Sequence, residues 1–161
     1  MLINGTFSQR KVKRVEESAP VIVVHGLAHA VAALEAAAGA GKPVMLLSAP
    51  DAGIAGGPGW WRELIAAARE AVPSAHVANL LDCGDDAGAA QAAIRAGVEA
   101  IVFSGRADVA ERLADIAGQR GARLVTERPE PALDLADAFF ASLETLRRRC
   151  AVILASAPTF C

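Results

Sequence analysis

Side chains that can do chemistry stand directly after the apolar runs of this sequence. The stretch "LLDCGDD" ends one run with Asp82 and Cys83, while His25, Ser48 and Arg128 follow three other runs. A carboxylate can serve as a general acid or base, a thiol as a nucleophile and a guanidinium as an anion contact. If the fold brings these residues together, they predict a site for a small anionic metabolite, with Asp82 and Cys83 as its catalytic pair.

Four further residues extend this candidate site. Ser104 and Arg106 follow the apolar run "AIVFS", and Gly56 and Gly57 belong to the loop "DAGIAGGPGWW". Glycines let the backbone approach a ligand closely, and free N–H groups at a helix start attract anions. The alternative for this loop is a mobile connector. The complete set of expected substrate contacts is His25, Ser48, Gly56, Gly57, Ser104, Arg106 and Arg128.

Five βα units must position these residues. Strand-like apolar runs at 21–25, 44–48, 76–81, 100–104 and 123–126 are each followed by apolar residues three or four positions apart. Near-continuous apolar strands are typical of a parallel sheet, in which ligands bind at the carboxyl ends of the strands. We therefore expect a single α/β domain over 21–161, preceded by an N-terminal arm over 1–20 that forms a short hairpin or a loose segment.

The ends of the helices carry their own signals. Gly41, Gly97 and Gly121 stand where helices should stop, and Asp86 and Asp108 stand where N-caps would help helices begin. The apolar spacing that starts at Leu135 continues past "CAVILAS", which favours one long last helix ending near Pro158. A sixth strand at "CAVILAS" is the alternative.

Composition excludes several classes of protein. The 161 residues suffice for one domain, and a net charge of -2 gives no basic face for nucleic acid. No apolar run is long enough to cross a membrane. The three cysteines lack CxxC spacing, which favours the reducing cytoplasm. The motif "GAGKP" has Pro43 where a phosphate-binding P-loop needs Ser or Thr, and the chain has no G-x-S-x-G element of a serine hydrolase.

The segment from Val21 to Gly105 resembles the class II, metal-dependent fructose-bisphosphate aldolase family. In that family strand two ends in a serine and strand three ends in "LDHG"; here the corresponding pieces are "VMLLS" and "LLDCG". The resemblance implies that Ser48 contacts substrate and that Asp82 is the acid/base. It also implies a TIM-barrel-like partial barrel with strand order 1-2-3-4-5. A flavodoxin-like open sheet with order 2-1-3-4-5 is the alternative.

The sequence also departs from this family. Cys83 replaces the zinc-ligating histidine of "LDHG", and the metal ligands of the family's later strands have no counterpart, so we expect neither a metal nor another cofactor. The resemblance then predicts an aldolase-like protein without the family's zinc site, lyase-like if it is an enzyme at all. A noncatalytic binding or assembly protein that keeps the scaffold is the alternative.

A partial barrel leaves open edges and an uncovered inner face. The N-terminal arm, the last helix or a second copy of the chain must cover the apolar surface. The spacing predicts that the last helix carries more apolar surface than one stripe needs, namely Phe139, Phe140, Leu143, Leu146, Ile153 and Leu154. This excess predicts a homodimer.

Overall fold

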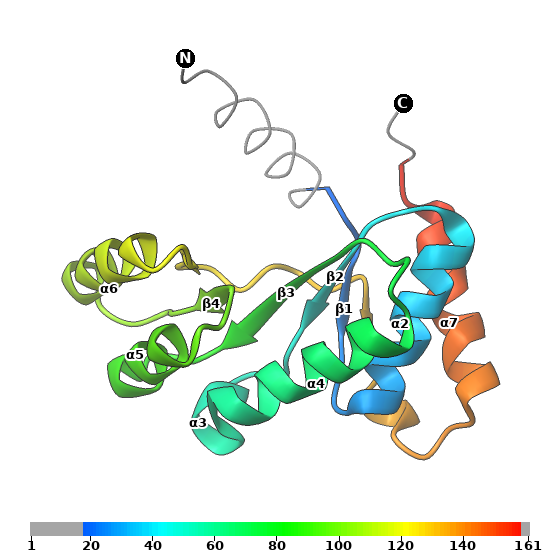
Figure 1. Ribbon diagram of the computed structural model, residues 1–161, viewed down its shortest axis with the longest axis horizontal. Helices are drawn as coiled ribbons and strands as arrows, with labels where there is room; N and C mark the ends of the chain where they lie inside the picture. Colours follow the sequence, from blue (N-terminus) through cyan, green and yellow to red (C-terminus); the bar gives the residue numbers. More distant parts are fainter. Residues whose placement is uncertain (1–17, 159–161) are drawn as a thin grey trace.

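A six-stranded parallel sheet organises the protein in the computed structural model, which describes residues 18–158 (Figure 1). The strands alternate with helices along most of the chain, as the repeated βα pattern predicts. The strands are β1 (Val21–Val23), β2 (Val44–Leu47), β3 (Val77–Asp82), β4 (Ala100–Val102), β5 (Arg123–Val125) and β6 (Leu133–Asp134). The helices are α2 (Leu27–Ala40), α3 (Ala52–Ala55), α4 (Gly57–Ala71), α5 (Ala87–Ala96), α6 (Ala107–Gln119) and α7 (Leu143–Ser156), with a 3₁₀ turn η1 (Ala136–Ala138).

The strand order is β5-β4-β3-β2-β1-β6, and every neighbouring pair is parallel. Because β2 pairs with β3, the barrel-like order 1-2-3-4-5 is confirmed and the flavodoxin-like order is excluded. The sheet is open and does not close into a barrel. The sixth strand was not predicted; it lies on the outer side of β1, where Leu133 pairs with Ile22 and Asp134 with Val23.

The two faces of the sheet differ. Alternate strand residues such as Ile22, Leu46 and Ile101 pack with the helices in one large apolar cluster. The opposite face, here called the helix-free face, carries a second cluster that contains no residue of the helices. Its buried members are Ala19, Val23, Met45, Leu47, Leu80, Ala100 and Val102.

A crossing segment, residues 126–132, connects β5 at one edge of the sheet with β6 at the other (Figure 1). Arg128 of this segment reaches Asp82, which follows Leu80 by two positions and so shares its face of the sheet. The crossing segment therefore passes over the carboxyl end of the helix-free face. It covers part of the surface that a half barrel leaves open.

Most of the expected helix ends are present. Gly41 and Gly97 adopt left-handed conformations, with φ of 63° and 80°, at the ends of α2 and α5. Asp86 caps α5 by accepting a hydrogen bond from the Ala89 N–H at 2.8 Å. Asp108 does not cap α6; it lies in the first turn, and Arg106 occupies the N-cap position.

The prediction of one long last helix from Leu135 was wrong for residues 135–142. Leu133 and Asp134 pair with β1, and η1 follows directly. The apolar spacing in this segment resembles that of a helix, but α7 begins only at Leu143. Ser142 is its N-cap and accepts a hydrogen bond from the Thr145 N–H at 3.2 Å. Over 150–156 the chain is helical, so the sixth strand considered at "CAVILAS" is excluded.

The C-terminal end of α7 is fixed to the loop after α2. Lys42 donates hydrogen bonds from Nζ to the carbonyls of Leu154 and Ala157, at 2.9 and 2.6 Å. A cation at a helix C-terminus is favourable, because the last carbonyls lack partners within the helix. The lysine of "GAGKP" therefore has a structural role.

The expected N-terminal hairpin or arm falls on residues that lie largely outside the described range. Within residues 18–158, no helix combines the length and apolar character that a bilayer span requires.

Candidate functional site at the carboxyl ends of the strands

Asp82 ends β3 and is buried, with a side chain that is 6% exposed. Its Oδ2 accepts a hydrogen bond from Arg128 Nη1 at 2.6 Å. Its Oδ1 accepts from the N–H of Gly84 at 2.8 Å and, more weakly, from that of Asp51 at 3.4 Å. Both carboxylate oxygens therefore accept hydrogen bonds from donors of the protein itself, as a buried polar group requires.

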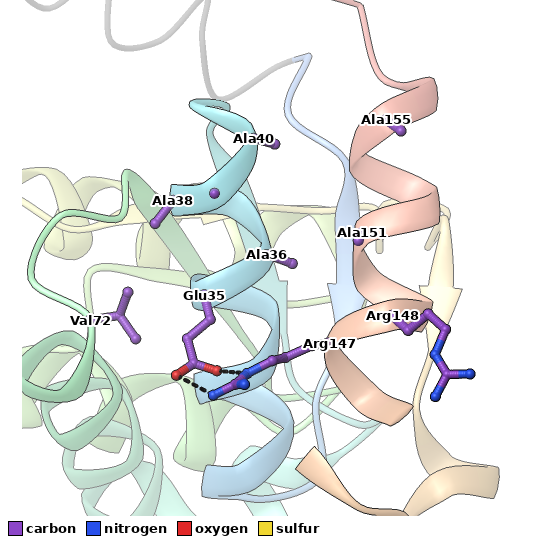
Figure 2. Close-up of a pocket in the computed structure, with 10 residues that line it drawn as sticks. Glu35, Ala36, Ala38, Ala40, Val72, Arg147, Arg148, Ala151 and Ala155 are labelled. Carbon is purple, nitrogen blue, oxygen red and sulfur yellow. Dashed lines mark hydrogen bonds and ion pairs between the residues drawn. The ribbon is translucent and has the colours of Figure 1, made fainter. Parts of the chain in front are cut away.

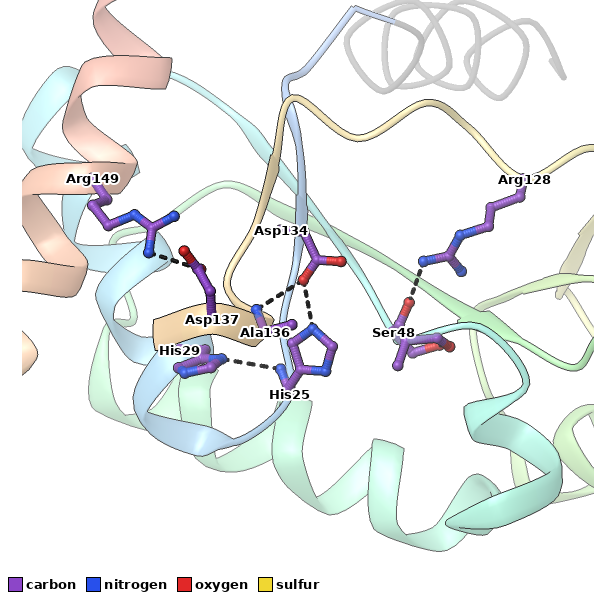
Figure 3. A network of polar contacts seen from close by, with 9 residues as sticks. His25, His29, Ser48, Arg128, Asp134, Ala136, Asp137 and Arg149 are labelled. Atoms are coloured by element: carbon purple, nitrogen blue, oxygen red, sulfur yellow. Dashed lines mark hydrogen bonds and ion pairs between the residues drawn. The ribbon is translucent and has the colours of Figure 1, made fainter. Parts of the chain in front are cut away.

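Ser48 lies beside Asp82, as the sequence predicts. Its hydroxyl accepts a hydrogen bond from the Asp82 N–H at 2.9 Å and donates to the Ala49 carbonyl at 3.0 Å. The Ser48 carbonyl accepts from Arg128 Nη2 at 2.8 Å (Figure 3). Three residues from β2, β3 and the crossing segment thus form one cluster, and Ser48 is fully buried within it.

Gly53, the glycine of "DAG", allows α3 to pack closely against the end of β3. A Cβ on Gly53 of α3 would lie 2.7 Å from Cys83 Sγ and 3.0 Å from the Asp82 carbonyl oxygen. Asp51, which precedes α3, has a φ of 58°, a left-handed conformation that is unusual for a residue other than glycine. The Gly-rich loop is therefore the short helix α3 packed onto the end of β3, followed by the start of α4.

Cys83 is fully buried. Burial, together with the nearby charges of Asp82 and Asp86, raises the pKa of its thiol to about 12. The thiolate is the reactive form of cysteine, and a thiol with such a pKa is protonated at neutral pH. The geometry therefore gives no support to the expected role of Cys83 as a nucleophile.

Five of the seven expected contacts lie outside this cluster: His25, which belongs to a second cluster, and Gly56, Gly57, Ser104 and Arg106. Ser104 is exposed, and its N–H donates to the Gly84 carbonyl at 2.8 Å. The Arg106 side chain is 79% exposed and forms an ion pair with Asp108 at 2.8 Å. Gly56 and Gly57 join α3 to α4, and no contact links either to Asp82 or Arg128.

His25 takes part in a second polar cluster, at the ends of β1 and β6 (Figure 3). Its Nε2 lies 2.6 Å from Oδ1 of Asp134, and that oxygen also accepts from the Ala136 N–H at 2.9 Å. Asp134 was missed because no strand was predicted between 126 and the last helix, which was expected to begin near Leu135. The signal that could have found it is the pair Leu133–Asp134 shortly after Pro129 and Pro131.

His29 supports this cluster from the first turns of α2. Its Nδ1 accepts a hydrogen bond from the backbone N–H of His25 at 3.2 Å. The residue is 1% exposed, and its Nε2 has no hydrogen-bond partner in the described chain. Burial lowers the pKa of His29, so its imidazole is neutral at physiological pH.

Asp134 connects the two clusters electrostatically. Burial alone would raise its pKa. The hydrogen bonds from His25 and from the Ala136 N–H, together with the electrostatic influence of the His25 ring and of the Arg128 guanidinium, outweigh burial and lower it. Asp134 is therefore ionised at neutral pH, and Arg128 acts on it as well as on Asp82.

The residues do not fit the zinc centre of class II aldolases. Cys83 would have to be a thiolate, which burial opposes. Across residues 18–158, no three His, Cys, Asp or Glu side chains are grouped so that they could hold a metal ion. We derive no chemistry from a metal at this site.

A groove of about 720 Å³ lies elsewhere, between α2 and α7 (Figure 2). Its polar lining consists of Arg148 and the ion pair of Glu35 with Arg147, and most of the other lining residues are small. Ligand sites usually combine apolar walls with several convergent polar groups, which this groove lacks. It reflects the packing of the alanine-rich helix α2 against α7. The lining residues are Glu35, Ala36, Ala38, Gly39, Ala40, Val72, Arg147, Arg148, Ala151 and Ala155.

Comparisons with known proteins give one informative result. No protein-family model matches the chain, and no curated protein matches it in sequence. Among solved structures, the fold is similar to that of a proposed fructose-1,6-biphosphate aldolase from Coccidioides immitis, with a TM-score of 0.60 and 19% sequence identity. The match covers 76% of this chain and 46% of the other, so this chain spans about half the length of its structural neighbour. The chain thus has an aldolase-like fold.

Proposed function

We propose that this protein is an aldolase-related protein that binds a small anionic metabolite, for example a phosphorylated one, at the carboxyl ends of its strands. The observation that carries the proposal is the position of Arg128. Asp82 and the Ser48 carbonyl fix its guanidinium, yet the side chain remains 25% exposed. A guanidinium has five N–H donors, so it keeps donors for a carboxylate or phosphate.

The aldolase-like fold supports ligand binding at this same edge of the sheet. Ligands of parallel α/β proteins bind outside the carboxyl ends of the strands, where Arg128, His25 and Ser48 are found. Arg128 and His25 are the proposed direct contacts, and Ser48 positions Arg128 through its carbonyl. Gly56, Gly57, Ser104 and Arg106 would contact only the outer part of a ligand.

If the protein is an enzyme, we propose lyase-like chemistry that does not use Asp82 as its acid/base. A general base needs a free lone pair within reach of the substrate proton. Both oxygens of Asp82 accept hydrogen bonds from the protein, and one of them faces a guanidinium. Its expected catalytic role would require the Arg128 ion pair to open.

The alternative is a noncatalytic binding or assembly protein, and one observation favours it. Phe140 is 96% exposed and Phe139 is 55% exposed, and their ring centroids lie 5.2 Å apart. Apolar side chains gathered in this way are typical of interaction surfaces. We place the protein in the cytoplasm, because Cys83 and Cys150 are both buried and free of disulfides.

A thermal-shift series with inorganic phosphate, pyruvate and dihydroxyacetone phosphate tests the binding proposal. A ligand that binds only the folded chain adds about 2.7 kcal/mol to its stability at a concentration one hundred times Kd. We expect at least one of these anions to raise the Tm of the wild type and of the control Arg106→Gln, but not of Arg128→Gln. If none of them shifts the wild-type Tm at millimolar concentration, the proposal is overturned.

A further inference from the structure

We propose that His25 and Asp134 form a proton-transfer site, in which Nδ1 of His25 accepts a proton from a carbon next to the carbonyl of a small anionic compound. The inference rests on the proposed function, because Arg128 would hold the anionic group of that compound. It assigns the acid/base role to a residue pair at β1 and β6, away from Asp82 and Cys83.

Hydrogen bonding sets the tautomer of His25. An ionised carboxylate only accepts hydrogen bonds, so the 2.6 Å contact with Asp134 Oδ1 places a proton on His25 Nε2. The neutral ring then carries its free lone pair on Nδ1. The Ala136 N–H holds the same Asp134 oxygen at 2.9 Å and so fixes the orientation of the pair. The His25 side chain is 21% exposed, which leaves it accessible at the rim of the sheet.

The surroundings of His25 favour this role. His29 of α2 accepts a hydrogen bond from the His25 backbone N–H at 3.2 Å, and its ring centroid lies 6.0 Å from that of His25. Because burial lowers the pKa of His29, its ring stays neutral and does not repel a protonated His25. The charged groups facing the pair are Asp134 itself, on β6, and Arg128, on the crossing segment.

The proton transfer balances without an added oxidant or metal. His25 Nδ1 takes the proton, and the electron pair of the broken C–H bond forms a C=C bond. The π pair of the carbonyl moves onto its oxygen and produces an enolate. Asp134 stabilises the imidazolium, and Arg128 offsets the negative charge of the ligand. Return of a proton from Nδ1 restores the compound, so in D₂O the net result is exchange of hydrogen for deuterium.

The test is hydrogen–deuterium exchange of pyruvate and dihydroxyacetone phosphate in D₂O, followed by ¹H NMR with the full chain. General acid–base catalysis typically contributes about 10²–10⁴-fold, so we expect His25→Gln to lower the exchange rate by about 100-fold or more. Asp134→Asn should lower it by about 10-fold or more. His76→Gln changes an exposed histidine at the opposite edge and should leave the rate unchanged.

A second measurement separates catalysis from folding. In the wild type, ¹⁵N NMR of the three histidine rings should show the proton of the neutral His25 ring on Nε2, and Asp134→Asn should weaken this preference because the carboxylate acceptor is lost. If His25→Gln does not fold, the exchange rate of Asp134→Asn and this spectrum decide the matter. Wild-type exchange no faster than in buffer, with anion binding retained, overturns the proton-transfer site alone. Absence of both binding and exchange overturns the proposed function as well.

Discussion

Arg128 donates a hydrogen bond from Nη1 to Oδ2 of Asp82 at 2.6 Å, although 46 positions separate the two residues in the sequence. The contact ties the crossing segment to the end of β3 on the helix-free face. It also gives a carboxyl group that is only 6% exposed a cationic hydrogen-bond partner. The same guanidinium is the proposed anion contact, so stability and binding depend on one side chain.

The first prediction concerns this ion pair. Arg128→Gln leaves the buried Asp82 carboxylate without its cation and should lower the free energy of unfolding by about 3 kcal/mol, measured by urea denaturation. Arg106→Gln removes an exposed arginine that pairs only with Asp108, and should change it by less than about 0.5 kcal/mol. Adding Asp82→Asn to Arg128→Gln should recover part of the loss. A cost for Arg128→Gln as small as that of the control would contradict the role of the pair.

The second prediction concerns the packing of α3 on β3. In Gly53→Ala the new Cβ would lie 2.7 Å from Cys83 Sγ and 3.0 Å from the Asp82 carbonyl oxygen. We expect a loss of about 1–3 kcal/mol in unfolding free energy. Gly59→Ala, within α4, meets nothing within 4 Å and should instead stabilise by about 0.5–1 kcal/mol. Equal effects of the two substitutions on the unfolding free energy would contradict tight packing of Gly53 against Cys83.

The third prediction concerns pH. Burial holds the pKa of His29 below its ordinary value of 6.5, so at lower pH the unfolded chain binds a proton that the folded chain does not. Stability should therefore rise between about pH 5 and about pH 7, above the range in which Asp134 and Glu99 titrate. His29→Asn keeps an acceptor for the His25 N–H and should flatten this rise, measured by denaturation at each pH. His76→Asn should leave the rise of stability with pH unchanged. If His29→Asn also leaves it unchanged, the pH dependence belongs to another group.

The fourth prediction is that the chain forms a homodimer through the exposed Phe139 and Phe140. We propose a second copy as the occupant because the two rings, with centroids 5.2 Å apart, form one exposed apolar pair that the same pair of a twofold-related copy can cover. Light scattering at micromolar concentration should give twice the monomer mass of 16.6 kDa. Phe140→Ser should shift the mass towards the monomer, whereas Val152→Ser, at another exposed apolar residue, should not. A monomeric wild type would refute the dimer.

Five strands and most of the helices could be predicted from sequence because their signals are local, whereas the order of the strands was predicted from the resemblance to the aldolase family. Apolar runs of strand length and left-handed glycines such as Gly41 and Gly97 act within a few residues of themselves. The position of Ser48 beside Asp82 was also predictable, because both end neighbouring parallel strands. β6 was not, since only two residues pair with β1, and their neighbours continue a spacing typical of helices.

The state of each site residue could not be read from the sequence. Whether Asp82 is free or paired depends on Arg128, which reaches it across the sheet. The raised pKa of the Cys83 thiol follows from its burial beneath α3. The position of α3 depends in turn on the left-handed conformation of Asp51. The partner of His25 comes from a strand that the periodicity concealed. Long-range contacts decided all three cases.

The pairing of β6 with β1 also constrains the order in which the protein folds. The first strand gains its second neighbour from the last strand to be synthesised, so one edge of β1 stays unpaired while the ribosome makes everything between them. α2 likewise lacks its packing partner until α7, against which it packs closely, has been synthesised. Contacts between such distant segments slow folding, because a long loop must close before they form. Nascent chains that end before Leu133 should therefore hold β1 as an exposed strand edge and depend on chaperones at that stage.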